Sequence, residues 1–271
     1  MTPSTSAAPT IRHSRGRRLL PPAPTAPPEP RRIRWYLAYP AVVGIYAMTL
    51  LSPWWALWPT PPMPGSPTAE AVAPFAARAW TVHAVTSLLV LALAVAVGRW
   101  TRVGLGGVGV APGWTRDPEH RAHARRQWWA VFAWVLGSYC AATGILAISG
   151  APLYPGQGEA DPAAMGVVLL PISVSTAWIE EVITVALVML LLRAARQPAA
   201  VAFLLVALAK IPYHLPQMGL PAVAVVVAAL VCAWMYHRTG RITPVIAAHA
   251  AHNVLLVGAI LASSGAVAAA H

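Results

Sequence analysis

The chain has 271 residues, of which 58% are hydrophobic and only 10% are charged. A soluble domain of this length carries far more polar surface, so the composition excludes an ordinary soluble protein. The net charge of +11 could suggest nucleic acid. However, the basic residues lie almost wholly between apolar blocks, which is typical of loops that face an anionic membrane surface, so we predict no nucleic-acid partner.

Residues 1–34 mix Pro, Ser, Thr, Ala and Arg and show no periodic apolar face. Such a segment cannot bury enough apolar surface to offset the entropy lost on ordering. We therefore predict a disordered basic tail, which its arginines hold on the cytoplasmic side of the membrane.

Seven apolar blocks follow the tail, separated by short stretches rich in Arg, Pro and Gly. Each block is about long enough to cross a ~30 Å hydrocarbon core as a helix, which takes roughly 20 residues at ~1.5 Å per residue. We therefore predict an all-α fold, a polytopic transmembrane helix bundle with about seven spans. The blocks cover residues 35–58, 80–100, 127–149, 163–193, 199–218, 219–237 and 243–264.

Three local features refine this prediction. The block at 163–193 is longer than one span needs, so we expect it to be tilted or to begin with an interfacial turn around Pro171. The short join at 216–219 predicts a tight antiparallel hairpin. The run GLGGVGV at 104–110 lacks the flanking strand and the downstream acidic residue of a dinucleotide-binding loop, so we expect a flexible loop.

The basic residues of the loops predict the orientation of the chain in the membrane. If the N-terminus lies inside, every Lys and Arg except Arg78 and Lys210 falls in the tail or in an inner loop, as the positive-inside rule requires. An odd number of spans then places the C-terminus outside. We predict a multi-pass protein of the cell membrane with this topology.

Ionisable residues inside membrane spans are costly, and each is by default a hypothesis for a functional site. Most of those in this chain fall in the last four blocks, and one, His83, lies in the second. They are Glu180 and Glu181 in the fourth block, Lys210 and His214 in the fifth, and His249 and His252 in the seventh, where the polar but uncharged Asn253 follows. The two cysteines, Cys140 and Cys232, lie in apolar blocks without metal-ligand spacing, so we interpret them as residues that fill space.

The spacing of these residues predicts how they face. His249 and Asn253 are four residues apart, so they lie on the same side of one helix. Neighbours such as Glu180 and Glu181 diverge by ~100° around a helix, so we expect one to point at a cavity and the other to bond to neighbouring helices. Brought together from three helices, Glu180, His214, His249 and Asn253 would form one compact polar site.

This set of side chains suits the activation of water. A carboxylate surrounded by apolar side chains is a stronger base than one in water, and a histidine beside it can share the water or protonate a leaving amine. A second histidine with an Asn can stabilise an oxyanion. The same atoms could instead hold zinc, because two His and one Glu with an open position form a catalytic zinc site. We interpret His83 and His252 as interhelical hydrogen-bond partners, and His237 as interfacial.

At these residues the chain resembles the CPBP family, the CAAX-protease and bacteriocin-processing membrane proteins that include the Ras-converting endopeptidases. The resemblance covers about 163–264. It rests on the Glu180-Glu181 pair, on His214 in the segment AKIPYHLPQMG, and on the late signature from His249 to Asn253. It implies that Glu180 and His214 activate water and that His249 and Asn253 form the oxyanion pocket.

Two positions depart from the family pattern. The family Arg four residues after the second Glu is Val185 in this chain, and the Phe of the second signature is Lys210. A buried Arg usually pairs with a carboxylate, so its absence removes a partner for Glu181. We hypothesise that Lys210 supplies the missing charge by approaching Glu181 or Glu180 to about 4 Å or less. The rival is a lysine whose stem lies along the helix and whose ammonium reaches water.

The sequence thus predicts three units: the tail at 1–34, N-terminal transmembrane helices at 35–160, and catalytic helices of the CPBP type at 161–271. The predicted function is an intramembrane endopeptidase that hydrolyses a membrane-associated peptide or protein, which can be lipid-anchored, through a glutamate-activated water. Glu181 and Lys210 support the site. We favour a mechanism without a metal or other cofactor, with zinc as the open alternative. The alternative function is a catalytically inactive relative, such as an immunity or scaffold protein, or a small transporter.

Overall fold

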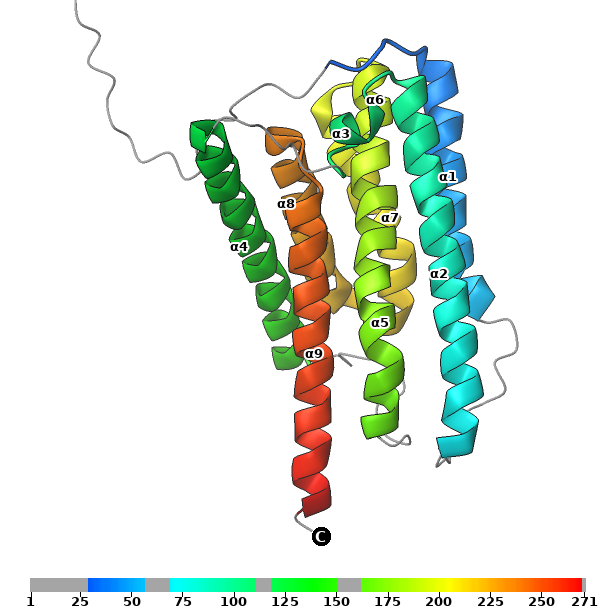
Figure 1. The fold of residues 1–271 in the computed structure, drawn as a ribbon, viewed down its shortest axis with the longest axis vertical. Helices are drawn as coiled ribbons and strands as arrows, with labels where there is room; N and C mark the ends of the chain where they lie inside the picture. The colour runs from blue at the N-terminus through cyan, green and yellow to red at the C-terminus, as the bar shows by residue number, and fades with distance from the viewer. Residues whose placement is uncertain (1–28, 57–68, 111–117, 151–161, 270–271) are drawn as a thin grey trace, which may run out of the picture.

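Long helices that lie roughly side by side make up the computed structural model, which describes residues 29–56, 69–110, 118–150 and 162–269 (Figure 1). These residues contain no strand, so the predicted all-α fold is confirmed. The elements are α1 (Trp35–Ala56), α2 (Ala69–Trp100), α3 (Gly104–Val108), α4 (Pro118–Ile148), α5 (Pro162–Glu180), the π-helix η1 (Glu181–Leu187), α6 (Val188–Ala194), α7 (Ala199–Met218), the 3-10 helix η2 (Leu220–Ala222), α8 (Val223–Thr239) and α9 (Thr243–Ala269).

So far as the structure describes them, the apolar blocks predicted from the sequence lie on these helices or on continuous helical runs. Within the described residues, four segments are long and apolar enough to cross a membrane: Ala76–Trp100, Arg121–Ile148, Leu169–Ala194 and Leu220–Thr239. The helices Ala199–Ile211 and Thr243–Ala259 are apolar but shorter. Large apolar side chains such as Leu88 and Leu204 point outward, as a surface in contact with lipid requires. The prediction of a polytopic helical bundle is therefore confirmed.

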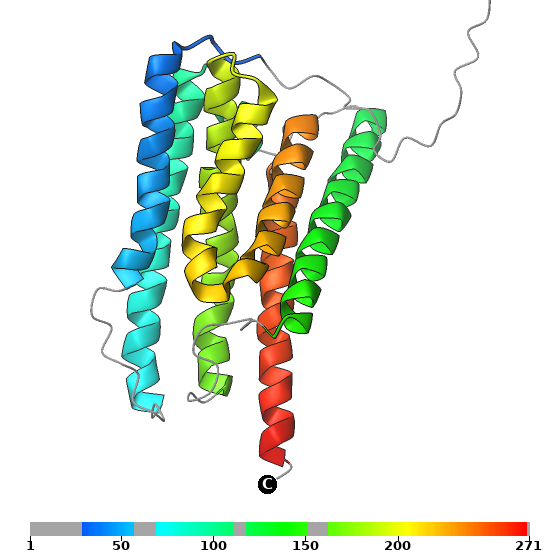
Figure 2. The same ribbon diagram turned by 180° about the vertical axis from the view of Figure 1, so that it is seen from behind.

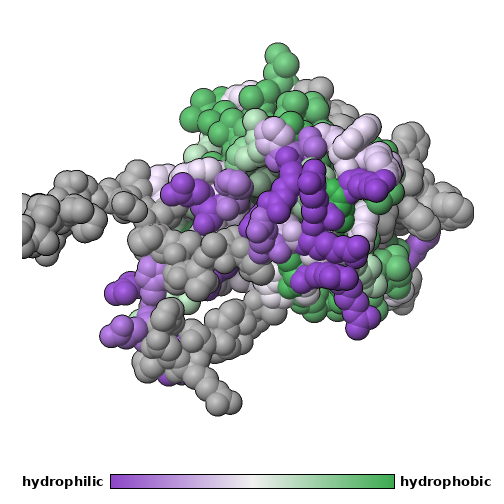
Figure 3. All heavy atoms as spheres, turned by 90° about the horizontal axis from the view of Figure 1, so that it is seen from above, coloured by the Kyte–Doolittle hydropathy of each residue, from purple (hydrophilic) through white to green (hydrophobic). Residues whose placement is uncertain are grey.

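The loops predicted to lie inside all meet at one end of the bundle. This basic end holds the first turns of α1, α4, α7 and α9 and the last turns of α2, α6 and α8, as Figures 1 and 2 show. Viewed from that end, hydrophilic side chains cover much of the described surface (Figure 3). The arginines of the connections there are Arg31, Arg32, Arg34, Arg99, Arg102, Arg193, Arg196, Arg238 and Arg241. Which side of the membrane this end faces stays a prediction.

The predicted tail is described only from residue 29 onward, and residues 1–28 lie outside the described residues. Residues 29–34 run across the basic end and make backbone hydrogen bonds there. The Arg31 amide donates to the Thr101 carbonyl at 2.7 Å, and the Ile33 amide donates to the Ala194 carbonyl at 3.0 Å. The entry to α1 is thereby attached to the ends of α2 and α6.

The glycine-rich run at 104–110 is not the flexible loop that we expected. It forms the short helix α3, with Val108 fully buried, and the Tyr236 hydroxyl donates to the Val108 carbonyl at 3.0 Å. Gly109 ends the helix with φ +84°, and a Cβ there would lie 2.3 Å from the Gly240 carbonyl oxygen. Glycine is therefore required at this position both by the backbone angle and by the close approach of the α8–α9 connection.

The central helix of the bundle is one run of three elements, α5, η1 and α6. It passes through Pro171 as an α-helix, so the alternative of an interfacial turn at that residue is wrong. All seven residues of the π-helix are buried. π-helical turns in proteins are rare and are frequent at functional sites, and this one begins at the second glutamate of the predicted pair.

A tight hairpin joins α7 to α8, as the short join in the sequence predicts (Figure 2). Gly219 supplies the turn with φ +64°, a conformation that favours glycine, and η2 follows directly. The hairpin sets α7 and α8 side by side, so the polar residues of α7 are held against the middle of the bundle.

Candidate active site

Four helical segments bring ionisable side chains together in the interior of the bundle. Glu180 is the last residue of α5 and Glu181 is the first of η1, while Lys210 lies on α7 and His249 on α9. Their burial differs. The side chains of Glu181 and Lys210 are 0% and 1% exposed, whereas Glu180 is 16% exposed. Glu180 is therefore the carboxylate of the pair that a substrate or water can reach.

Lys210 lies between the two carboxylates. Its Nζ donates to Glu180 Oε2 at 2.6 Å and lies 3.6 Å from Glu181 Oε1. We hypothesised that Lys210 replaces the absent arginine by approaching a glutamate to about 4 Å or less. Both distances meet this condition, so the predicted contact is confirmed. The rival, an ammonium that reaches water at the membrane interface, is wrong because the side chain is buried.

The two glutamates do not point in unrelated directions, as the ~100° divergence of neighbours led us to expect. An oxygen of each lies within 4.8 Å of the other and of a His249 nitrogen. The Lys210 ammonium is the physical reason, because it attracts both carboxylates to one place. Their surroundings still differ as expected, since Glu181 bonds to neighbouring helices and Glu180 is the more exposed.

Sequence reasoning missed Tyr139, which lies on α4 at the centre of this cluster. Its hydroxyl donates to Glu181 Oε1 at 2.8 Å and lies 3.2 Å from His249 Nδ1. Its ring stacks on the His249 ring with centroids 4.4 Å apart. The Cys232 thiol of α8 lies 3.7 Å from the same hydroxyl. A tyrosine inside an apolar block resembles a core or interfacial residue, so no local signal distinguished it.

His249 is held by its Nδ1 atom, which lies 2.8 Å from Glu181 Oε1. A carboxylate oxygen only accepts, so Nδ1 carries the proton of this hydrogen bond. The Tyr139 ring on one side and the Glu181 carboxylate at Nδ1 fix the plane of the imidazole. This leaves Nε2 as the ring atom that can face a substrate.

Asn253 lies one turn beyond His249 on α9. Both residues face the continuous helical run of α5 and η1, as the four-residue spacing predicts. Its Nδ2 donates to the Ser173 carbonyl of α5 at 3.2 Å, and its Oδ1 lies 3.4 Å from His252 Nδ1. The amide nitrogen has two hydrogens, so one remains for a further acceptor.

His214 lies one turn beyond Lys210 on α7 and is partly buried. It is close enough to Glu180, Lys210 and His249 to interact with them electrostatically. The structure therefore brings His214 to the same side of the bundle as the glutamates.

The two histidines that we interpreted as structural each have an interhelical partner. His83 Nδ1 of α2 lies 2.9 Å from the Ser175 hydroxyl of α5. His252 Nε2 of α9 lies 2.7 Å from the Thr143 hydroxyl of α4. Both interpretations are confirmed.

The donor set that could hold a metal differs from the one considered from the sequence. Within the described residues it consists of Glu180, Glu181 and His249 and does not include His214. These residues do not fit a zinc ion well, because the Lys210 ammonium already lies between the two carboxylates at 2.6 and 3.6 Å. A divalent cation placed there would be repelled by that charge.

The fold and the site define a polytopic helical membrane protein with a buried cluster of acid–base side chains. Residues 162–255 match the family model described as type II CAAX prenyl endopeptidase Rce1-like, so this segment of the chain is similar to that family. The comparisons with curated proteins and with solved structures give no match. The resemblance noted from the sequence is thus confirmed, and all six predicted site residues fall within the matched segment.

Proposed function

We propose that the protein is an intramembrane endopeptidase in which Glu180 activates water for the hydrolysis of a peptide bond. The observation that carries this proposal is the buried cluster in which Lys210 joins Glu180 to Glu181, and Glu181 in turn fixes His249. Glu180 is the more exposed carboxylate of the pair, so it is the one placed to meet a water molecule and a substrate.

In the proposed reaction, Glu180 accepts a proton from water while the water oxygen bonds to the carbonyl carbon of the scissile peptide. The negative charge that develops on the carbonyl oxygen is stabilised by His249 Nε2–H and by the second hydrogen of Asn253 Nδ2. The C–N bond then breaks, and the leaving amine takes up a proton passed on through His214. The products are a carboxylic acid and an amine.

The charges of the cluster support this division of roles. Two carboxylates and the Lys210 ammonium leave one negative charge, and unbalanced charge in an apolar interior is unfavourable. His249 in its imidazolium form would cancel that charge and would carry the Nε2–H that an oxyanion needs. Glu181, with Tyr139 as its second partner, orients this imidazole and does not itself contact the substrate.

The ion pair with Lys210 acts against one expectation from the sequence, that apolar surroundings make the Glu180 carboxylate a stronger base. An ion pair at 2.6 Å stabilises the carboxylate of Glu180 and makes it a weaker base than burial in apolar surroundings alone would. The proposed mechanism therefore relies on positioning and on the oxyanion donors as well as on the basicity of Glu180.

The proposed substrate is a peptide or protein held at the membrane, including one with a prenyl anchor, since the matched family is one of CAAX prenyl endopeptidases. We propose that the basic end of the bundle faces the cytoplasm, with the N-terminus inside and the C-terminus outside, and that residues 161–271 form the catalytic unit. No metal is assigned a role.

The test uses the full chain in liposomes with an internally quenched peptide that carries a prenylated cysteine, and the same peptide without the prenyl group. Glu180→Gln should lower cleavage by about a hundredfold or more, because an amide fills the same space but cannot accept the proton. The matched control is His83→Gln, which alters a buried polar residue bonded to Ser175 outside the cluster. A chelator should leave cleavage unchanged.

Cleavage that is equal in the wild-type protein and in Glu180→Gln would contradict the proposal. Absence of any cleavage by a folded wild-type protein, with both peptides, would favour the alternative of a catalytically inactive relative. Loss of cleavage on chelation, restored by zinc, would contradict the metal-free mechanism.

A further inference from the structure

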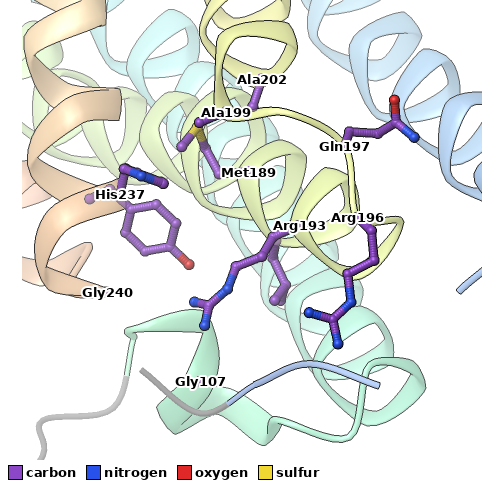
Figure 4. Close-up of a pocket in the computed structure, with 11 residues that line it drawn as sticks. Gly107, Met189, Arg193, Arg196, Gln197, Ala199, Ala202, His237 and Gly240 are labelled. Atoms are coloured by element: carbon purple, nitrogen blue, oxygen red, sulfur yellow. The ribbon is translucent and has the colours of Figure 1, made fainter. Parts of the chain in front are cut away.

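A pocket lies at the basic end of the bundle, away from the acid–base cluster. It has a volume of about 280 Å³ and lies among α3, the end of α6, the start of α7 and the end of α8 (Figure 4). Arg193 is twelve residues beyond Glu181 on one helical run, which corresponds to about 18 Å at ~1.5 Å per residue. The pocket is therefore not part of the proposed active site.

The lining of this pocket has an apolar part and a cationic part. Met189, Leu190 and Tyr236 contribute apolar surface, and Arg193 and Arg196 contribute two guanidinium groups. Figure 4 shows the two arginine side chains extending in the same direction, toward α3 at Gly107. Two guanidinium groups on one side of a pocket form a site for an anion with several oxygens, because each presents a planar fork of N–H donors.

The backbone at Arg196 is informative. This residue has φ +57°, the left-handed conformation that glycine adopts most easily and that commonly follows the end of a helix. Arginine at this position turns the chain at a cost that glycine would avoid. The Arg196 side chain lies at the pocket, so this strained backbone position places a cation there.

Arg196 already has a carboxylate as a partner. Its Nη1 forms an ion pair with Glu29 Oε1, from the segment that crosses the basic end before α1. Both side chains are more than half exposed, at 53% and 65%, so the pair is open to solvent and can exchange. An anion of this chain therefore occupies one side of the cationic part of the pocket, and an external anion would compete with it.

We propose that this pocket binds a phosphate group, and that its source is the head group of an anionic phospholipid. The pocket lies at the end of the transmembrane helices, where lipid head groups lie, and cationic pockets between such helices are suited to them. Its volume is below the roughly 300–1,000 Å³ of sites for drug-sized ligands, so it fits a head group and not a whole lipid. The inference does not depend on proteolytic activity.

The experiment measures lipid retained by the full-length protein, with phosphatidylglycerol and phosphatidylcholine as probes in otherwise identical detergent micelles, read by native mass spectrometry. Wild type should retain phosphatidylglycerol about fivefold or more over phosphatidylcholine. Arg193→Gln combined with Arg196→Gln should lower the retention of phosphatidylglycerol about tenfold. The matched control is Arg99→Gln, an exposed arginine of the same end outside the pocket lining, which should change retention less than about twofold.

Glu29→Gln provides a test that does not weaken the pocket. Removing the competing carboxylate should raise the affinity for phosphatidylglycerol about two- to threefold. The Glu29→Gln result tests the proposal even if the double arginine variant does not fold, because Glu29 is exposed and its substitution leaves the packed interior unchanged.

Three results would overturn the proposal. The first is equal retention of the two lipids, and the second is an equal loss in Arg99→Gln and in the double variant, which would indicate general surface charge. The third concerns the source of the phosphate. If free glycerol phosphate binds as tightly as phosphatidylglycerol, the pocket is a site for a soluble phosphate and not for a lipid.

Discussion

Replacement of Lys210 with Met would test the charge balance of the cluster most directly. Methionine has a similar length but no charge, so the two carboxylates would lose an ammonium at 2.6 and 3.6 Å. Removal of one partner of a buried ion pair typically costs about 3–5 kcal/mol, because the other charge is left uncompensated. Lys210 is 1% exposed, and its site holds two carboxylates, so we expect a loss of stability in that range together with a loss of cleavage.

The assay is unfolding of the purified protein in mixed micelles, followed by tryptophan fluorescence. The control is the double variant Lys210→Met with Glu180→Gln. Removing the nearer carboxylate should restore part of the lost stability, so the two substitutions should be non-additive by about 1 kcal/mol or more. Full additivity, or a Lys210→Met variant as stable as wild type, would refute the assignment of a buried ion pair.

Three further predictions concern other parts of the molecule. Tyr139→Phe should lower kcat about tenfold with little change in KM, because it removes a donor to Glu181 without touching the substrate; a rise in KM alone would contradict this role. Gly109→Ala should destabilise the protein by about 1–3 kcal/mol or more in the same unfolding assay, since its Cβ would lie 2.3 Å from the Gly240 carbonyl. The control Gly137→Ala, in open space on α4, should be neutral or mildly stabilising. Reporter fusions should place the N-terminus inside and the C-terminus outside, and a cytoplasmic signal from the C-terminus would contradict the topology.

The helices could be predicted from the sequence because the membrane imposes a single strong constraint. A span must satisfy its backbone internally and present apolar side chains to lipid, so long apolar blocks become helices whatever their neighbours are. The same physics makes polar residues inside the blocks conspicuous, so Glu180, Glu181, Lys210 and His249 are all among the candidates from the sequence. The sequence grouped Glu180 and His249 with His214 and Asn253, and gave Lys210 only a supporting role. The four-residue spacing of His249 and Asn253 then fixes their common side.

Other features depend on contacts between distant segments, and no local pattern encodes them. Tyr139 lies within an apolar block, where a tyrosine has many ordinary roles, and only the approach of Glu181 and His249 shows that it belongs to the cluster. The helix α3 has poor intrinsic propensity, because glycines are common in it, and it is stabilised by burial of Val108 and by the bond from Tyr236. The π-helix likewise follows from packing, since all its residues are buried.

At Val185 and Lys210 the chain departs from the family pattern, and the structure shows how a charge that is absent at one position is supplied from another. Val185 is fully buried in the π-helix, so this position supplies no charge to Glu181. The charge comes from a different helix, through Lys210, whose ammonium lies within 4 Å of both carboxylates. What a buried pair of carboxylates requires is a positive charge at that point, and it does not matter which helix provides it.

A lysine is nevertheless not equivalent to an arginine. Its single ammonium can approach Glu180 closely, whereas a planar guanidinium would hold one carboxylate at two points. The exchange thus shifts the cation toward the glutamate that we propose as the base, and the consequence for turnover is open to measurement. The variant Lys210→Phe with Val185→Arg would return the charge to the family position, and if location of the charge governs the basicity of Glu180, its pH–rate profile should differ from that of the wild-type protein.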